Sequence, residues 1–478
     1  MSLPAHKTKL VCTIGPASEA PEVMERMLLA GMNVARLNFS HGALESHGRV
    51  IENLRAASRR SGRRVAIMAD LPGPKMRIGR IAEEPVYLER GDPFTLTTEE
   101  ILGDRTRAWV TFEPLPRTVR PGDTLYLNDG LIQLEVVRVS ASDVTCRTVV
   151  GGEIRSRKGL NVPRVDLGIR AFTERDRECL RFALEHGVDA VSQSFVESAA
   201  DVEAVRAAAT SLGKSPFVIA KIERDRALDR IDEILEAADG IMIARGDLGV
   251  EVPIERIAVV QKDLMRRANM RGKPVITATQ MLESMTGNPR PTRAEATDVA
   301  NAILDGTDGV MLSGESAMGR YPVEATAMLG KIAAAVEPHV RQKSVEELYR
   351  GVDLRGRLRP GHLIALSVEE SLKYASPAAV FVPTRSGATA RNITLFRLPV
   401  WIVAISSDEA TCRRLQFSYG VQPVFEPDST EDRSAYIRRW VRDEGLEGDY
   451  AIRTEGPSPE HPESNHRMEI VDLTPAPG

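Results

Sequence analysis

The sequence predicts an α/β protein: a (β/α)8 TIM barrel with an all-β lid domain inserted after strand 3 and a C-terminal α/β domain. Short apolar, β-branched runs alternate with amphipathic helical stretches eight times, which is typical of βα units around a parallel sheet. Helical periodicity disappears between residue 70 and about residue 173, and α/β alternation resumes after about residue 338. A chain of 478 residues also exceeds the size at which a single core usually stops growing.

Eight apolar runs supply the expected barrel strands. They lie at residues 10–15, 33–39, 65–70, 190–195, 218–223, 240–245, 274–280 and 309–314, with helices such as 21–31, 201–213 and 296–306 between or after them. We therefore assign residues 1–71 to the first part of the barrel and residues 169–340 to the second part.

Residues 72–168 are assigned to the lid, because they read as short alternating strands separated by Gly, Pro and Asp turns. Loops at the carboxyl ends of barrel strands carry active sites, so an insert at this place is positioned to cover one. Residues 341–478 form the last domain. Its expected strands are 363–368, 378–384, 400–406, 421–427 and 468–473, and its expected exposed polar loop is 453–467.

Composition excludes several classes of protein. A net charge of -4 with 27% charged residues leaves no basic stripe, so we expect no nucleic-acid partner. Four cysteines without a C-x-x-C spacing, Cys12, Cys146, Cys179 and Cys412, predict inert thiols rather than zinc or disulfides. No apolar run reaches the roughly 18 residues of a membrane span, and no signal core opens the chain. We expect a cytoplasmic protein without a membrane partner.

The carboxyl ends of the expected strands are rich in polar groups, and such residues face the site of a barrel. In strand order from the second they are Arg36, Asn38, Ser40 and His41; Asp70; Ser192 and Ser194; Lys221 and Glu223; Arg245 and Asp247; Thr277, Thr279 and Gln280; Ser313 and Glu315. Glu223 and Asp247 have no His or Cys nearby, which favours Mg²⁺ or Mn²⁺ over zinc. The alternative is that both carboxylates are solvated or paired with cations.

Positive charge accompanies these carboxylates. Lys221 stands two residues before Glu223 on a strand, so both side chains point to the same face. With Arg36 and Arg77, it suits a phosphoryl group whose oxygens carry transition-state charge, unless these cations only pair with the acids. Residues 244–253, ARGDLGVEVP, place a Gly-rich turn before a short helix, whose free N–H groups suit a carboxylate or phosphate; simple turn chemistry is the alternative.

The motifs resemble one family over nearly the whole chain. KTKLVCTIGPAS, GMNVARLNFSHG, GLNVPRVDL, IAKIE, IMIARGDLGVEVP, VITATQMLESM, PTRAEATDVANAILDGTDGVMLSGE and YPVEA are similar to the signatures of the pyruvate kinases, in that family's order. The resemblance implies transfer of the phosphoryl group of phosphoenolpyruvate to ADP, giving pyruvate and ATP in glycolysis. It also implies a homotetramer and a mobile lid over the nucleotide.

The resemblance also implies roles for matched residues. Arg36 and Arg77 would hold the phosphoryl group, Lys221 would stabilise it in transfer, and Glu223 and Asp247 would bind the divalent ion. Thr279 would lie beside the enolate carbon, and the turn at Gly246 and Asp247 would hold the substrate carboxylate. The nucleotide region would include His41 and Pro72, and the monovalent-cation region would include Asn38, Ser40, Asp70, Leu71 and Lys75.

One stretch departs from the better-known pattern. Potassium-requiring members read Asp-Thr-Lys-Gly-Pro-Glu, whereas this chain reads Asp70-Leu71-Pro72-Gly73-Pro74-Lys75. A tethered ammonium supplies the charge of K⁺ and repels a second cation. We therefore predict dependence on Mg²⁺ or Mn²⁺ but not on K⁺, as in a lysine-bearing subgroup of the family. The alternative is that Lys75 turns to solvent and K⁺ still binds. Pro72 replaces a lysine, which leaves the local nucleotide contacts open.

The last domain contains a candidate effector loop. Residues 382–392 read as a strand, a polar turn and a helix, and Thr384, Arg385, Ser386, Gly387 and Thr389 form a candidate phosphate cradle. The comparable loop of relatives binds a sugar phosphate, so a sugar phosphate or nucleotide effector is one interpretation and a plain helix N-cap is the other.

Two other functions compete with the kinase. A Mg²⁺-dependent lyase or aldolase acting through a pyruvate enolate would share the metal and carboxylate pocket. A catalytically silent homologue would bind phosphometabolites or partner proteins, but the full set of Arg36, Lys221, Glu223, Asp247 and Thr279 argues against it.

Overall fold

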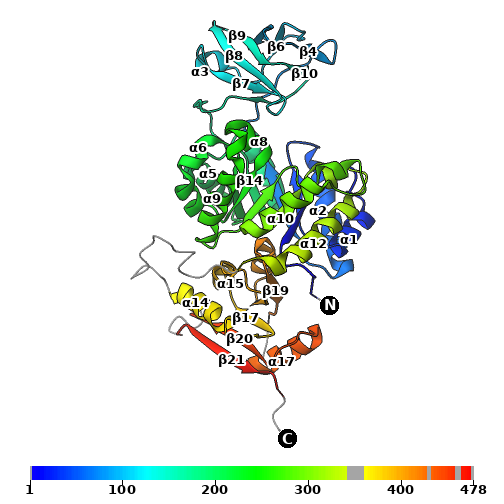
Figure 1. Ribbon diagram of the computed structural model, residues 1–478, viewed down its shortest axis with the longest axis vertical. Coiled ribbons are helices and arrows are strands. Elements are labelled where there is room, and N and C mark those ends of the chain that lie inside the picture. Colours follow the sequence, from blue (N-terminus) through cyan, green and yellow to red (C-terminus); the bar gives the residue numbers. More distant parts are fainter. Residues whose placement is uncertain (1–2, 342–359, 428–431, 458–464, 475–478) are drawn as a thin grey trace.

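The structure is a computed structural model that describes residues 3–341, 360–427, 432–457 and 465–474. Three bodies are stacked along its long axis, with the β insert at one end, the barrel in the middle and the C-terminal α/β domain at the other end (Figure 1). The predicted fold class is confirmed.

The barrel consists of eight parallel strands that close in the order β1-β16-β15-β14-β13-β12-β3-β2. Their bounds are β1 (Lys9–Thr13), β2 (Met32–Asn38), β3 (Ala66–Leu71), β12 (Ala190–Gln193), β13 (Phe217–Ile222), β14 (Gly240–Ala244), β15 (Val275–Ala278) and β16 (Gly309–Leu312). These strands are buried on both faces, so they appear in the sequence as continuous apolar runs rather than as alternating ones. Every expected barrel strand overlaps an observed one.

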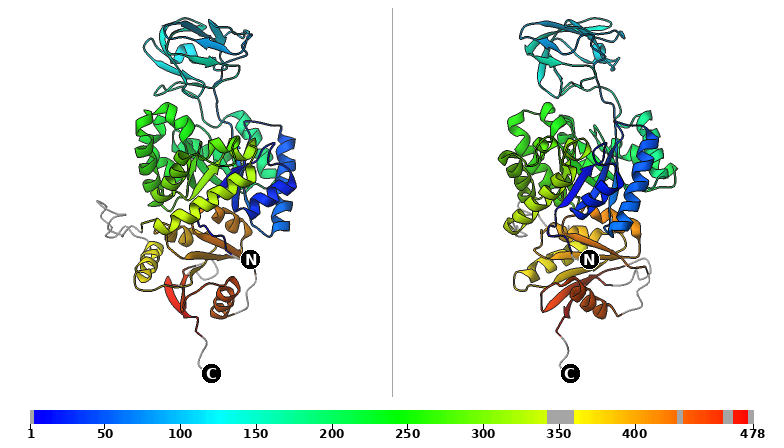
Figure 2. Two further views of the ribbon diagram at one scale, coloured as in Figure 1. Left: turned by 45° about the vertical axis from the view of Figure 1, so that its right-hand side comes forward. Right: turned by 90° about the vertical axis from the view of Figure 1, so that its right-hand side faces the viewer.

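Helices cover the outside of the barrel (Figures 1 and 2). They are α1 (Pro21–Leu29), α2 (Leu44–Ser61), α4 (Glu174–Glu185), α5 (Ala199–Ser211), α6 (Asp225–Asp229), α7 (Ile231–Ala237), α8 (Arg245–Glu251), α9 (Ile257–Asn269), α10 (Arg293–Asp305), α11 (Gly314–Ala317) and α12 (Pro322–Val336), with short 3-10 turns η1 (Ile254–Arg256), η2 (Glu283–Thr286) and η3 (Glu337–His339). Capping boxes begin α4 at Thr173 and α10 at Thr292, where the side chain accepts a backbone N–H that the helix cannot satisfy.

The insert leaves the barrel directly after β3. A six-stranded sheet and a two-stranded sheet, in the orders β11-β7-β8-β9-β5-β6 and β10-β4, enclose a separate apolar core. Their elements are β4 (Val86–Leu88), β5 (Pro93–Thr97), β6 (Arg107–Trp109), α3 (Leu115–Thr118), β7 (Thr124–Leu127), β8 (Ile132–Val139), β9 (Asp143–Val150), β10 (Gly152–Ile154) and β11 (Leu160–Asn161). The outgoing and returning segments pair where Arg77 bridges Gly159, and the insert lies beyond the barrel end of this connection (Figure 2).

The C-terminal domain is a five-stranded sheet in the order β19-β18-β17-β20-β21, in which only the edge strand β21 is antiparallel to its neighbour. Its described elements are α14 (Pro360–Leu372), β17 (Ala379–Pro383), α15 (Ala388–Thr394), β18 (Trp401–Ser406), α16 (Glu409–Arg414), η4 (Leu415–Phe417), β19 (Val421–Phe425), α17 (Arg433–Glu444), β20 (Tyr450–Glu455) and β21 (Arg467–Asp472).

Two details of this domain differ from the prediction. The prediction of a strand at 363–368 is wrong. These residues lie in α14, where Ala365, Val368 and Glu369 are buried at helical spacing. Conversely, β20 was not predicted, since its buried Arg453 and Thr454 give it the polarity of a loop. The expected loop therefore begins later than residue 453, and its residues 458–464 lie outside the described ranges.

The floor of the barrel is completed by the C-terminal domain. Phe417 of η4 belongs to the cluster of side chains inside the barrel, and its ring stacks on Phe217 with 5.3 Å between centroids. Beside it, the ammonium of Lys9 donates to the carbonyl of Val421 at 2.7 Å, and Arg397 pairs with Asp308 at 3.2 Å. The barrel and the last domain thus share a packed and charged junction.

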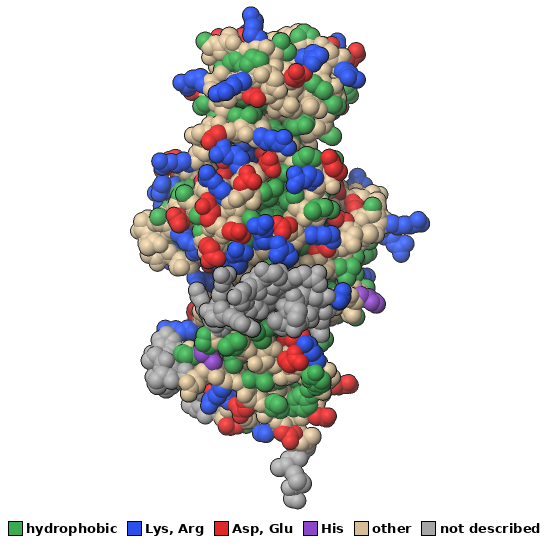
Figure 3. Space-filling model, turned by 60° about the vertical axis from the view of Figure 1, so that its left-hand side comes forward, with side chains coloured by type: hydrophobic (Ala, Val, Ile, Leu, Met, Phe, Trp, Pro, Cys, Tyr) green, Lys and Arg blue, Asp and Glu red, His purple; other side chains and the backbone are tan. Residues whose placement is uncertain are grey.

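On the face drawn in Figure 3, acidic and basic side chains are interspersed over the barrel. Within the described ranges, no helix combines the length and the apolar character that crossing a bilayer requires.

Candidate functional site

The site is built around Asp70, at the carboxyl end of β3. Its Oδ2 accepts from Arg36 at 2.9 Å from Nε and 2.5 Å from Nη2, and its Oδ1 accepts from Ser192 at 2.7 Å. The ammonium of Lys221 lies 3.4 Å from Oδ1. Burial opposes ionisation of Asp70, but the charges of Lys221 and Arg36 outweigh burial and lower its pKa. Asp70 is therefore a carboxylate that fixes two cations.

Lys221 and Glu223 form the next pair, from the end of β13. Lys221 Nζ lies 2.8 Å from Glu223 Oε1 and donates to Ser194 Oγ at 2.7 Å. Burial alone would lower the pKa of Lys221, but Asp70 and Glu223 outweigh it and raise that pKa. The lysine therefore keeps its proton in a site from which water is largely excluded.

Glu223 is itself held in place. Its Oε2 accepts from the backbone N–H of Phe195 at 2.8 Å. Burial raises the pKa of Glu223, and so does the negative charge of Asp247, whereas Lys221 lowers it. Two carboxylates that repel one another in a buried site suit a divalent cation, because the cation offsets both charges.

The turn from β14 into α8 carries Gly246 and Asp247. A Cβ at position 246 would lie 2.7 Å from Cγ2 of Thr279, so only glycine lets this backbone approach Thr279. Thr279 has a φ of +76°, which is unusual for a β-branched residue. Such strain persists where the surroundings hold it, and it is concentrated at functional sites.

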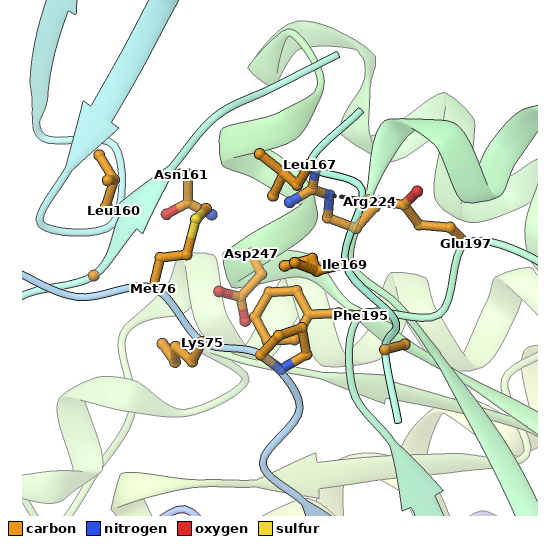
Figure 4. A pocket seen from close by; sticks show the side chains of 13 residues that line it. Lys75, Met76, Leu160, Asn161, Leu167, Ile169, Phe195, Glu197, Arg224 and Asp247 are labelled. Carbon is orange, nitrogen blue, oxygen red and sulfur yellow. Dashed lines mark ion pairs between the residues drawn. The ribbon is translucent and has the colours of Figure 1, made fainter. Parts of the chain in front are cut away.

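A cleft of about 450 Å³ opens between this turn and the insert. Figure 4 shows Asp247 near its centre, with Lys75 on one side and Arg224 and Glu197 on the other. The cleft therefore lies between Asp247, whose charge acts on Glu223, and the segment around Lys75 that leads into the insert.

Positive charge surrounds the mouth of the site. Burial, followed by the charges of Arg77, Lys75 and Arg36, lowers the pKa of His41, so its imidazole is neutral at neutral pH. The guanidinium of Arg77 donates to the carbonyl of Arg157 at 2.8 Å, on the returning segment of the insert. Arg77 is thus placed on the lid side, apart from the cluster around Asp70.

The remaining members of the expected monovalent-cation region lie near Asp70, and each makes contacts of its own. Asn38 Oδ1 accepts from the N–H of Ser40 at 3.1 Å. The side chain of Leu71 is fully buried in the outer core of the barrel, and its carbonyl accepts from Ser194 at 2.7 Å. The Pro-Gly-Pro turn that begins at Pro72 is fixed by the N–H of Gly73, which donates to Asp176 at 2.9 Å.

Other strand-end residues have structural partners. Arg245 makes a bidentate pair with Asp298 at 2.6 and 2.7 Å and donates to the carbonyl of Thr279 at 2.9 Å. Thr277 hydrogen-bonds to Thr307 at 2.9 Å, and Glu315 accepts from the N–H groups of Leu282 and Ser313.

Two contributing residues were missed from the sequence. Thr13, which accepts from Arg36 at 2.9 Å, ends β1 and could have been found by the strand-end rule. Phe195, which binds Glu223 through its backbone at a φ of +59°, has no local sequence signal.

The candidate effector loop lies in the C-terminal domain, far from the lid (Figure 1). Thr384 Oγ1 accepts from the N–H of Gly387 at 2.9 Å, and the carbonyl of Arg385 accepts from Thr411 at 2.7 Å. Gly387 has a φ of +77°. The exposed Arg385 and Ser386 and the half-buried Thr389 surround a turn that leads into α15.

The donor set fits a hard divalent cation. Within the residues that the structure describes, no three His, Cys, Asp or Glu side chains gather at one point. Asp247 lines the cleft, and its charge acts on the buried carboxylate of Glu223. Two neighbouring carboxylates suit Mg²⁺ or Mn²⁺, which keep several oxygen ligands from water or phosphate.

Comparison with known proteins supports this interpretation. The family model described as pyruvate kinase, barrel domain, matches residues 5–326, and that described as pyruvate kinase, alpha/beta domain, matches residues 362–471. A protein of Thermococcus litoralis named pyruvate kinase is 49% identical over 459 residues, which cover 95% of this chain and 96% of that protein. Proteins of the same name from Geobacillus stearothermophilus and Staphylococcus aureus are 44% and 43% identical, over 87% and 88% of this chain and 71% and 72% of their own. The chain belongs to the pyruvate kinase family.

Proposed function

We propose that the protein transfers the phosphoryl group of phosphoenolpyruvate to ADP, giving pyruvate and ATP in glycolysis. The observation that carries this proposal is the buried ammonium of Lys221, which lies between the carboxylates of Asp70 and Glu223 and near Arg36. A phosphoryl group in transfer has little covalent chemistry to assist, so catalysis depends on placing fixed positive charge around it.

Each residue of the site has a part in this reaction. Glu223 and Asp247 would hold Mg²⁺ or Mn²⁺, which supplies charge neutralisation at the phosphoryl oxygens. Lys221 keeps its proton on Nζ and stabilises the charge that develops during transfer. Arg36, fixed by Asp70, and Arg77, on the lid side, bind the phosphoryl oxygens. The backbone at Gly246 and Asp247 binds the substrate carboxylate, and Thr279 lies beside the enolate carbon.

We further propose that the enzyme needs no K⁺. Both oxygens of Asp70 are occupied by cations and by Ser192, and Leu71 offers the site no side-chain oxygen. Lys75 lies in the cleft with Asp247, near enough to His41 to lower the pKa of that imidazole. A fixed ammonium in this region disfavours a second monovalent cation.

The other proposals concern regulation, assembly and location. A sugar phosphate or nucleotide would bind the loop of Thr384, Arg385, Ser386, Gly387 and Thr389, and Pro72 and His41 would face the ADP. A homotetramer is supported by exposed apolar side chains on the barrel, Ile254 and Val259, and on the last domain, Tyr374 and Ile470. Four buried free thiols agree with a cytoplasmic location.

The test is pyruvate formation from phosphoenolpyruvate and ADP with Mg²⁺, first without K⁺ and then with K⁺ against a tetramethylammonium control. Full activity without K⁺ is expected. Activity that appears only with K⁺ would overturn the proposal on Lys75 and leave the kinase. Folded protein inactive in both buffers, also with candidate effectors, would favour the lyase or the silent homologue.

The role of Lys75 is tested separately with Lys75→Glu, which restores the residue of potassium-requiring members. We expect this variant to become stimulated by K⁺, whereas Lys158→Glu, which changes charge equally on the returning segment of the insert, should not create that stimulation.

A further inference from the structure

The segment that returns from the lid is fastened to the barrel by charged contacts. We call residues 164–166 the strap and residues 224–226 the anchor. Arg164 of the strap pairs with Asp225 of the anchor at 3.6 Å, and Asp166 pairs with Arg226 at 2.9 Å. Between them, the guanidinium of Arg224 donates to the carbonyl of Val165 at 3.4 Å. Each anchor residue therefore holds one residue of the strap.

The anchor follows Glu223 without an intervening residue, so whatever holds Arg224 also restrains the backbone that carries this carboxylate. The Arg224 side chain is 4% exposed. Its Nε lies 3.3 Å from Glu197 and 3.5 Å from Glu251. Both carboxylates lie near this buried guanidinium and favour its present orientation, because an unpaired buried charge is costly.

Glu251 connects the anchor to the other proposed metal ligand. It is the last residue of α8, whose first turn carries Asp247, and its side chain is 1% exposed. A helix of two turns moves as one piece, so fixing Glu251 fixes the direction in which Asp247 points.

Arg226 provides an internal comparison. Like Arg224, it pairs with Glu197, at 3.4 Å, and holds the strap through Asp166. Unlike Arg224, it has no ion pair with Glu251 among the described residues, and its side chain is 30% exposed. The two arginines share the strap but only Arg224 reaches α8.

We propose that Arg224 is a positioning residue: by joining Glu251 of α8 to Val165 of the strap, it holds Glu223 and Asp247 in the geometry that binds the divalent cation and links that geometry to the lid. This inference rests on the proposed metal site of Glu223 and Asp247. Residues that orient metal ligands typically change metal affinity by about 10–100-fold when they are replaced.

The experiment measures Mn²⁺ binding to the full-length protein without substrate, by the EPR signal of free Mn²⁺. Arg224→Gln should raise the dissociation constant at least about 10-fold. Hydrogen exchange should also rise in two peptides of this variant, one covering residues 162–171 and one covering residues 245–252. Arg226→Gln should raise exchange in the first peptide only and leave the dissociation constant within about twofold of wild type.

Two further variants keep the test decisive if Arg224→Gln folds poorly. Arg224→Lys keeps the charge but cannot span Glu197, Glu251 and Val165 at once, so it should still weaken Mn²⁺ binding. Glu251→Gln keeps the shape of the side chain and should weaken it too. Wild-type affinity in both variants, or equal weakening by Arg226→Gln, would overturn the positioning role.

The proposed function is checked in parallel. Wild-type protein that forms no pyruvate refutes the proposed function, whereas Glu223→Gln with unchanged Mn²⁺ affinity refutes the metal site and this inference with it. Active wild-type enzyme, a Glu223→Gln variant that loses Mn²⁺ and an Arg224→Gln variant that binds it normally would refute the positioning role alone.

Discussion

Replacing Lys9 with methionine removes a buried ammonium from the junction between the barrel and the C-terminal domain. Lys9 is 3% exposed, donates to the carbonyl of Val421 at 2.7 Å and lies 5.9 Å from the ring centroid of Trp401. Burial lowers the pKa of Lys9 from 10.5 to about 8, although the charges of Glu337 and Asp308 oppose that shift. Below pH 8 the folded protein therefore holds a charge that is poorly solvated.

The sign and size of the effect follow from this shift. Between pH 8 and 10.5 the folded chain binds fewer protons at Lys9 than the unfolded chain does, so its free energy of unfolding rises with pH. At about 1.36 kcal/mol per pKa unit, burying the ammonium lowers the free energy of unfolding by about 3 kcal/mol below pH 8. This cost disappears above pH 10.5, where Lys9 is neutral in both the folded and the unfolded chain. For 478 residues the entropy of unfolding is about 1 kcal/mol per kelvin, which converts this cost to about 3 °C in Tm.

The assay compares the Tm of wild type and of Lys9→Met at about pH 7 and about pH 10.5. The difference in Tm between wild type and variant should shift by about 3 °C in favour of wild type as the pH is raised over this interval. The hydrogen bond lost in the variant changes Tm by a constant amount at both pH values and does not affect this shift. Lys214→Met, at an exposed lysine, is the control and should run parallel to wild type. Parallel curves for Lys9→Met would refute the reasoning.

Three further predictions concern the site and the barrel floor. Lys221→Met should lower kcat about 1000-fold, because the lost charge acts in the transition state, with phosphoenolpyruvate binding largely kept; near-normal turnover would contradict its role. Gly246→Ala should raise the KM for phosphoenolpyruvate, because the new methyl group clashes with Thr279. Adding Thr279→Ser deletes the opposing methyl group and should bring the KM part of the way back; an unchanged KM in the double variant would exclude this clash as the cause. Phe417→Ala should cost about 3–5 kcal/mol and lower Tm, with Phe417→Leu milder; an unchanged Tm in calorimetry would contradict the shared core.

Local pattern made part of this structure predictable. Barrel strands are apolar on both faces, so length and flanking turns identify them, and strand alternation was enough to place Lys221 and Glu223 on one face, where they lie 2.8 Å apart. The lid could be located because its turns break the helical period directly after Asp70. Its exact bounds, 72–168, stay a prediction.

What the sequence could not supply is the register between strands and the contacts of loops. Asp70 lies beside Asn38 on one side and Ser192 on the other, and this alignment lets Arg36, Ser192 and Lys221 reach the same carboxylate. No local pattern encodes it. Likewise, Arg224 meets Glu197, Glu251 and the returning Val165 only in the folded protein, so in the sequence its charge resembled that of any surface arginine.

The position of Phe417 has a consequence for biosynthesis. The ring that fills the base of the barrel is encoded far downstream of β16, the last barrel strand. On the ribosome, where N-terminal domains generally fold first, all eight barrel strands emerge before this ring does. The nascent barrel is therefore an unfinished intermediate with an open floor, and synthesis of the C-terminal domain is the step that completes it.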